Sequence, residues 1–181
     1  TSATYDVNTG LIKTATDENN QTTTLTYSSA SLRQTRMDGP VGSGIWTTVD
    51  YNDATWPYHV KTTQSLDVNR SVSTWDFSNG AGQQFRSRAL TSAGYLSSEV
   101  EFDIMGGEVK TYNPYTVPGL TDNVPAGVEF TEVVQRDGLG RPTQVKLQDG
   151  TSVYSYFNEE MVTVAYPAPD SSQVVGIASR S

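Results

Sequence analysis

The sequence predicts an all-β fold in which antiparallel hairpins follow one another and form a curled or spiral sheet. Three observations predict it. Threonine and serine are frequent, and tyrosine, with 10 residues, outnumbers the other aromatic types, as is typical of strands. Apolar and polar residues alternate in short runs, and no apolar stripe of helical spacing exceeds two turns. Glycine, asparagine and aspartate separate these runs at short intervals.

The alternating runs mark the clearest strands. TTTLTY (22–27) places Leu25 and Tyr27 on one face, and SVYSY (152–156) and MVTVAY (161–166) alternate in the same way. The clearest turn is Asp-Gly at 149–150, because both residues tolerate the positive φ of a type I′ turn. We therefore expect a type I′ hairpin there.

Composition restricts the function classes. A chain of 181 residues suits one domain that buries most of its apolar surface. With 20 acidic and 12 basic residues the net charge is −8, which repels nucleic acid and anionic lipid, so we expect neither as a partner. No apolar run approaches the roughly 18 to 20 residues of a membrane span. We expect a soluble chain, with any export signal outside it.

The residue inventory also argues against an enzyme. Cysteine is absent and His59 is the single histidine, so thiol chemistry, histidine-based zinc binding and a serine triad lack the residues they need. We predict no catalytic residue, no metal site and no cofactor.

Aromatic residues near expected strand ends recur at intervals of 22 to 28 residues. They are Tyr5, Tyr27, Tyr51, Phe77, Phe102, Phe130 and Tyr156. Several lie beside an aspartate, and glycine follows a few residues later. When residues 5–27 are aligned with 136–156, Asp6 meets Asp137 and Gly10 meets Gly140. Both segments then consist of an aspartate turn, a strand, a polar turn and a strand.

This pattern resembles the YD repeats of the RHS family, in which Tyr-Asp, Gly-Arg, a strand, a glycine turn and a second strand succeed one another. The resemblance covers most of residues 3–158. YDVNTGL has Leu11 where arginine is usual, and RDGLGRP has Arg136 where tyrosine is usual. The repeats are weakest between Ser28 and Trp75.

The resemblance implies a single repeat domain over residues 1–166, forming an arc of an RHS-type β-shell. Residues 112–128 are expected to be a proline-rich insertion that interrupts any strand, and 167–181 a tail or an edge-covering strand. Larger relatives use such shells to enclose a toxin or as surface scaffolds. The implied function is structural, in a secreted or cell-surface bacterial protein whose partners are flanking repeats or domains. The self-cleaving C-terminal core of RHS proteins is missing, so no autoproteolysis is expected.

The recurring aspartates and glycines are predicted to form structural turns. An aspartate at a strand end can accept N–H groups one and two residues later, and the following glycine supplies a left-handed conformation. The residues assigned to such turns are Asp6, Gly10, Asp76, Asp103, Gly106, Asp137, Gly140 and Arg141. QRDGLGRPTQV (135–145) superficially resembles a phosphate loop or an acid with its arginine. A strand-like run follows it, however, which favours a turn closed by a surface ion pair.

Two other acidic stretches allow alternative interpretations. Glu99, Glu101 and Asp103 alternate along one strand face about 7 Å apart, which suits either glycoside hydrolysis or a solvated acidic face. DENNQ (17–21) offers oxygen ligands for calcium, but lacks the glycine and final glutamate of a calcium loop. We expect a solvated face and a polar hairpin tip.

The tryptophans support an alternative function, that of an extracellular module that binds a carbohydrate or a surface protein. Exposed aromatic rings can hold sugar rings, although packing in the core is the commoner role. The residues of this possible platform are Trp46, Tyr51, Trp56, Tyr58 and Trp75. His59 is expected to be a surface or hydrogen-bonded turn residue.

Overall fold

The computed structural model describes residues 1–158, 161–167 and 174–180, with side chains as far as 157. The chain divides into two compact units, Thr1–Leu96 and Ser97–Ser181, with the boundary inside the segment that the sequence predicts as one domain. Every regular element among the described residues is a strand, and the strand pairs are antiparallel. The predicted all-β class and antiparallel hairpin organisation are confirmed.

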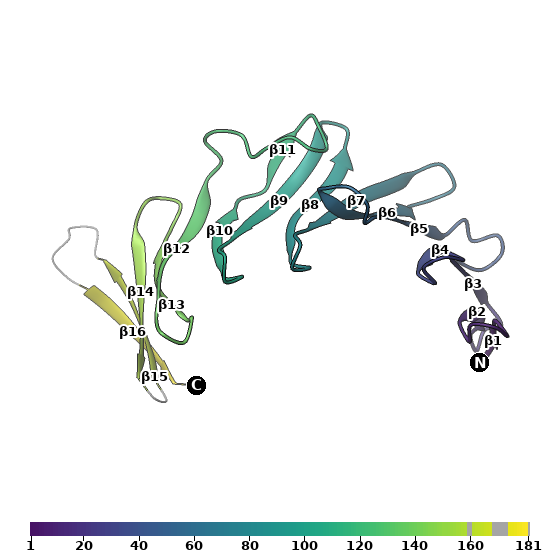
Figure 1. Cartoon of the computed structure of the whole chain (residues 1–181), viewed down its shortest axis with the longest axis horizontal. Helices are drawn as coiled ribbons and strands as arrows, with labels where there is room; N and C mark the ends of the chain where they lie inside the picture. Colours follow the sequence, from purple (N-terminus) through teal and green to yellow (C-terminus); the bar gives the residue numbers. More distant parts are fainter. Residues whose placement is uncertain (159–160, 168–173, 181) are drawn as a thin grey trace. The chain divides into compact units, whose positions relative to one another are not determined.

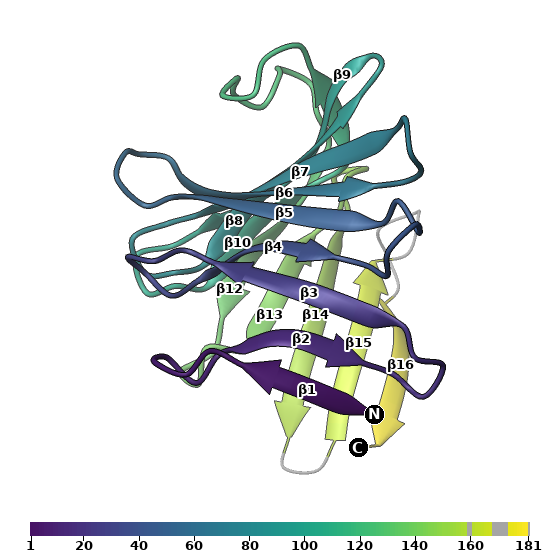
Figure 2. The same ribbon diagram turned by 90° about the vertical axis from the view of Figure 1, so that its right-hand side faces the viewer.

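In the first unit each strand pairs with the next strand in the chain, so that neighbours in sequence lie side by side (Figure 2). The strands are β1 (Ser2–Tyr5), β2 (Ile12–Thr16), β3 (Thr22–Tyr27), β4 (Gln34–Asp38), β5 (Trp46–Asn52), β6 (Tyr58–Ser65), β7 (Ser71–Ser78) and β8 (Gln84–Thr91). All turns after odd-numbered strands therefore lie along one end of this sheet.

The second unit follows the same rule with one interruption. Its strands are β9 (Gly94–Phe102), which begins just before the boundary, β10 (Glu108–Tyr112), β11 (Tyr115–Val117), β12 (Phe130–Arg136), β13 (Pro142–Lys146), β14 (Ser152–Asn158), β15 (Met161–Pro167) and β16 (Val174–Arg180). β10 pairs with β12, whereas β11 leaves this order and pairs with β9 (Figure 1).

The segments predicted as insertion and tail both contain strands. β11 lies inside residues 112–128, so the expectation that prolines interrupt any strand there is wrong. Tyr115 and Val117, 7% and 2% exposed, anchor this short strand by burial. Of the predicted tail, β16 pairs with β15, while residues 168–173 and 181 lie outside the described residues.

The hydrophobic core of the first unit is small. Trp75 and Phe77, 8% and 0% exposed, alternate along β7 and are paired with Arg88 and Arg86 of β8. Large apolar residues at turn tips are nearly fully exposed, among them Val7, Val41, Ile104, Met105 and Leu139. Burial of apolar residues is therefore concentrated in a few strands, and the turns depend on hydrogen bonds for their order.

Candidate functional site

Among the residues that the structure describes, one turn geometry closes five hairpins. In each, the N–H of the first residue donates to the carbonyl of the fifth, and the N–H of the fourth donates to the carbonyl of the first. The fourth residue is left-handed, with φ between 62° and 83°. The turns span residues 17–21, 79–83, 103–107, 137–141 and 147–151. We call them the five-residue turns.

A side chain caps four of these turns from the first position. One side-chain oxygen accepts the N–H groups of the third and fifth residues, at 2.8 to 3.0 Å. The capping residues are Asp17, Asn79, Asp103 and Asp137. The expected bond from the N–H two residues later is confirmed, whereas the one expected from the next residue is replaced by a bond from the residue four positions later. The acceptor therefore spans the whole turn and ties its two ends together.

The hairpin at 147–151 is present, but its turn is not type I′. Of the Asp-Gly pair, Gly150 alone has positive φ, 83°. Leu147 occupies the first position and cannot cap, and Asp149 instead accepts the N–H and hydroxyl of Thr151. The Asp-Gly signal identifies the hairpin correctly. The hydrogen bond from the Leu147 N–H to the Thr151 carbonyl, however, makes the loop longer than that of a type I′ turn.

A six-residue version closes the β1–β2 and β3–β4 hairpins. Asp6 and Ser28 each cap the N–H groups two and three residues later, and Gly10 and Leu32 are left-handed at φ 71° and 57°. The second turn lies where the sequence repeat is weakest. Serine replaces aspartate and leucine replaces glycine there, yet the turn geometry is kept.

Replacing Leu32 with glycine is expected to stabilise the first unit by up to about 1 kcal/mol. The left-handed conformation costs a non-glycine residue about 1–2 kcal/mol, which exceeds the entropic cost of glycine of about 0.5–1 kcal/mol. Urea denaturation followed by tryptophan fluorescence measures the change, because all three tryptophans lie in this unit. Ala30→Gly in the same turn is the control and should destabilise, since Ala30 is not left-handed. If Leu32→Gly instead destabilised the unit, the inferred backbone strain at Leu32 would be contradicted.

Asp76 is not a turn residue. It lies within β7, where its carboxylate accepts Gln84 Nε2 at 2.9 Å and Ser87 Oγ at 2.7 Å. The predicted role is wrong because the strand continues to Ser78 and Asn79 caps the turn. The amide oxygen of Asn79 supplies the same acceptor, a substitution that a search for Asp-Gly spacing misses.

Cationic side chains strengthen two of the caps. Arg141 donates Nε to Asp137 at 2.7 Å, which confirms the ion pair in the turn, and Lys13 lies 2.9 Å from Asp6. Desolvation raises the pKa of Asp137, but the backbone and guanidinium hydrogen bonds of Arg141 outweigh it and lower that pKa overall. Hydrogen bonding to Lys13 and to the N–H groups of the turn lowers the pKa of Asp6.

The lowered pKa values predict acid sensitivity. An unfolded aspartate has a pKa of about 3.9, and the folded pKa of Asp137 is lower, so folding releases a proton between the two values. The stabilisation is fully present above the unfolded pKa and is lost as pH falls through the folded pKa. Urea midpoints at pH 7, 5 and 3 should therefore be similar at the first two values and lower at the third. Asp137→Asn keeps an acceptor but cannot titrate, and should lose less on acidification; an identical loss would contradict this role.

Arg136 connects two neighbouring turns of the second unit. Its guanidinium donates to the carbonyl of Gly140 at 2.9 Å and to the carbonyl of Glu108, beside the turn at 103–107. Gly107 leaves room for it, because a Cβ there would lie 3.2 Å from Arg136 Cζ. In the sequence Arg136 stands out only as a departure from the usual tyrosine, and no local pattern predicts this contact.

Turns of the first unit are connected in a similar way. Arg33, which ends the β3–β4 turn, forms an ion pair with Asp53 of the β5–β6 turn. The Tyr51 hydroxyl donates to the carbonyl of Gln34 at 3.0 Å, and the Arg33 guanidinium lies 5.0 Å from the Tyr51 ring centroid. Tyr51 therefore joins adjacent hairpins.

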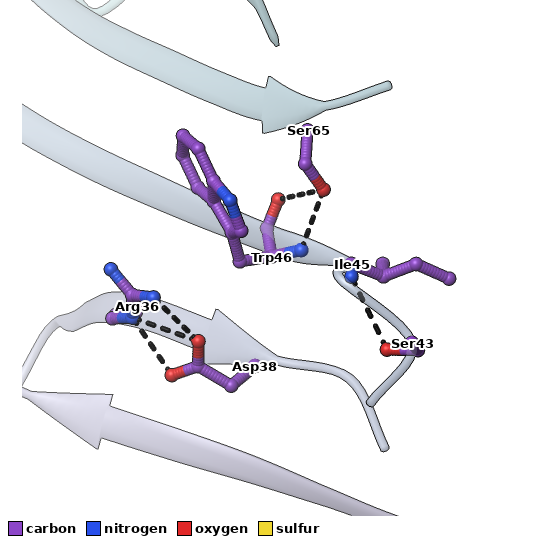
Figure 3. A network of polar contacts seen from close by, with 6 residues as sticks. All are labelled: Arg36, Asp38, Ser43, Ile45, Trp46 and Ser65. Atoms are coloured by element: carbon purple, nitrogen blue, oxygen red, sulfur yellow. Dashed lines mark hydrogen bonds and ion pairs between the residues drawn. The ribbon is translucent and has the colours of Figure 1, made fainter. Parts of the chain in front are cut away.

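The three tryptophans do not form one platform. Trp75 is buried, which makes its assignment as an exposed ligand residue wrong. Trp46 is half-buried, and its backbone N–H donates to Ser65 Oγ at 2.7 Å (Figure 3). The Arg36 guanidinium lies 5.6 Å from the Trp46 ring centroid and is itself bonded to Asp38. Both tryptophans therefore have structural contacts.

Trp56 has a different environment. It is 62% exposed and lies 5.6 Å from Tyr58, centroid to centroid, with Tyr58 itself 37% exposed. His59 follows, and its Nδ1 lies 3.0 Å from the Pro57 carbonyl. The expected hydrogen bond is present, but the predicted turn position is wrong, because His59 lies within β6. The structure thus brings together two of the predicted platform residues, Trp56 and Tyr58, and adds Phe85 of β8.

The acidic strand face is engaged by tyrosines. The Tyr115 hydroxyl donates to Glu99 at 2.5 Å, and that of Tyr112 donates to Glu101, which also lies 3.4 Å from Lys110 Nζ. Burial and the hydrogen bond to Glu101 raise the pKa of Tyr112 to about 12. Asp103, the third carboxylate, caps its turn. All three carboxylates therefore accept hydrogen bonds within the structure.

Across the described part of the chain, no three histidine, cysteine, aspartate or glutamate side chains are placed to share a metal ion. Residues 17–21 form a hairpin tip in which Asp17 caps the backbone. The same described residues contain no helix with the length and apolar character needed to cross a membrane.

Neither the models of known protein families nor the curated proteins compared with this chain give a match. The resemblance to YD repeats therefore depends on the residues of the repeats themselves.

Proposed function

We propose that this chain is a non-catalytic structural segment that contributes strands and joints to a β-sheet scaffold or shell. The observation that carries the proposal is the recurrence of one hydrogen-bonded turn, capped by a side chain, at four hairpins of the described chain. An aspartate used to hold its own backbone is an architectural residue, because one of its two carboxylate oxygens is occupied by N–H groups of its own turn.

Contacts between turns support the same function. Arg136 connects two turns of the second unit, and the Arg33–Asp53 pair connects two turns of the first. Such contacts fix the spacing of neighbouring hairpins where apolar burial is slight. The strands are thereby held in order without a large core under each turn.

Flanking strands or domains are the partners we propose. β1 pairs with β2 along one side, and all four of its residues are exposed. Exposed strand edges carry backbone donors and acceptors that a further strand satisfies. With the resemblance to YD repeats, this supports a secreted or cell-surface bacterial scaffold, including the shells that enclose a toxin.

An activity assay distinguishes this scaffold from an enzyme built on the acidic face. Purified chain is incubated with a panel of polysaccharides and reducing-end release is measured, beside a Glu99→Gln, Glu101→Gln double variant. The scaffold predicts no release above buffer with either protein. Release by the parent chain that the double variant abolishes, with an unchanged urea midpoint, would establish catalysis and overturn the proposal.

A further inference from the structure

Trp56 presents one face of its indole to solvent and rests on protein with the other. The indole stacks on Phe85 with a centroid distance of 5.6 Å and an interplanar angle of 15°. Tyr58 meets it edge-on, at 5.6 Å and 89°. Since Trp56 is nevertheless 62% exposed, the face away from Phe85 is open.

The exposed ring is anchored to the core of the first unit. Phe85 lies 6.2 Å from Phe77, centroid to centroid, and Phe77 is 0% exposed. A continuous aromatic chain thus runs from the surface at Trp56 to the most buried aromatic side chain. Rings held in this way lose little freedom when a ligand binds, which favours binding.

The turn that carries Trp56 is also held by hydrogen bonds. Asn52 Nδ2 donates to the carbonyl of Thr55 at 3.0 Å and to that of Pro57 at 3.3 Å, on either side of Trp56. Thr55 Oγ1 returns a hydrogen bond to Asn52 Oδ1 at 3.1 Å. The position of the indole is therefore set before any ligand arrives.

The turn that carries Trp56 also carries an exposed carboxylate. Asp53 is paired with Arg33, and their side chains are 62% and 47% exposed. A carboxylate and a guanidinium that keep free edges can accept and donate hydrogen bonds to hydroxyl groups. An open aromatic face on a turn that also carries an exposed carboxylate suits a ligand that is apolar on one side and rich in hydroxyls at its rim.

We propose that the open face of Trp56 binds the apolar C–H face of a neutral pyranose ring in a glycan. The net charge of −8 disfavours an acidic sugar. A single exposed indole is smaller than the apolar patches that bind proteins. This binding site goes beyond the scaffold function and is independent of it, since a scaffold without the site would fold in the same way.

Nuclear magnetic resonance of the three indole N–H groups tests the proposal on the whole chain. The probes are neutral β-1,4-glucan, β-1,3-glucan and β-1,4-galactan oligosaccharides, with oligogalacturonate as the acidic comparison. We expect at least one neutral oligosaccharide to shift the Trp56 signal in a saturable way at millimolar concentration, while the buried Trp75 signal stays in place. Absence of a Trp56 shift with every neutral probe, or tighter binding of oligogalacturonate, would overturn the proposal.

Variants locate the binding. Trp56→Ala should weaken binding at least tenfold, and Trp56→Tyr, which keeps a ring, should retain more affinity. Trp46→Phe is the matched control and should leave the affinity within twofold. An unmoved Trp75 signal in each variant checks that the first unit is folded. Undiminished affinity in Trp56→Ala would place the site elsewhere and contradict the assignment.

Discussion

Replacing Phe77 with alanine is expected to destabilise the first unit by about 3–5 kcal/mol, the cost of deleting a fully buried aromatic side chain. Phe77 is 0% exposed and lies among the rings of His59 and Phe85, with centroids 5.2 and 6.2 Å away. The small size of this core leaves few neighbours able to fill the cavity. Urea denaturation followed by tryptophan fluorescence measures the loss.

Leu90→Ala on β8 provides the control for this loss. Leu90 is 48% exposed, and its truncation should change the free energy of unfolding far less. Equal losses in the two variants would show that burial in this unit is not concentrated at Phe77.

Gly140→Ala is expected to destabilise the second unit by about 1–2 kcal/mol through backbone strain alone. Gly140 has φ of 81°, and an added Cβ would have nothing within 4 Å, so crowding does not contribute. Far-UV circular dichroism during urea denaturation gives the free energy. Amide exchange at Asp137, which closes this turn, reports the local effect.

Gly138→Ala in the same turn is the matched control. An added Cβ there also has nothing within 4 Å, but Gly138 is outside the left-handed region. Its replacement should be neutral, or stabilising by up to about 1 kcal/mol, because alanine restricts the unfolded chain. If both variants were equally destabilised, the left-handed conformation of Gly140 would not be the cause.

The sequence predicts the features that depend on local chemistry. Alternation of side chains and turn residues identifies the antiparallel hairpins, and aspartate followed by glycine identifies the caps at Asp6, Asp103 and Asp137. These signals succeed because a capped turn is made by residues only a few positions apart.

Prediction from the sequence fails where a different residue type supplies the same turn geometry. It also fails where pairing or exposure depends on residues that are distant in the sequence. Asn79 and Ser28 provide the acceptor oxygen without a carboxylate, so a search for aspartate misplaces one cap and overlooks the other. β11 is fixed by its pairing with β9, and the exposure of Trp56 depends on Phe85, which belongs to another hairpin. Neither relation appears in the local pattern of residues.

Amide hydrogen exchange at the closing N–H groups tests most directly whether the capped turns are structural joints. These groups belong to Asp17, Asn79, Asp103, Asp137 and Leu147. The account predicts that all five exchange as slowly as amides within the adjoining strands, and that the four capped turns are the better protected. Exchange at the rate of an unstructured peptide at these positions would contradict it.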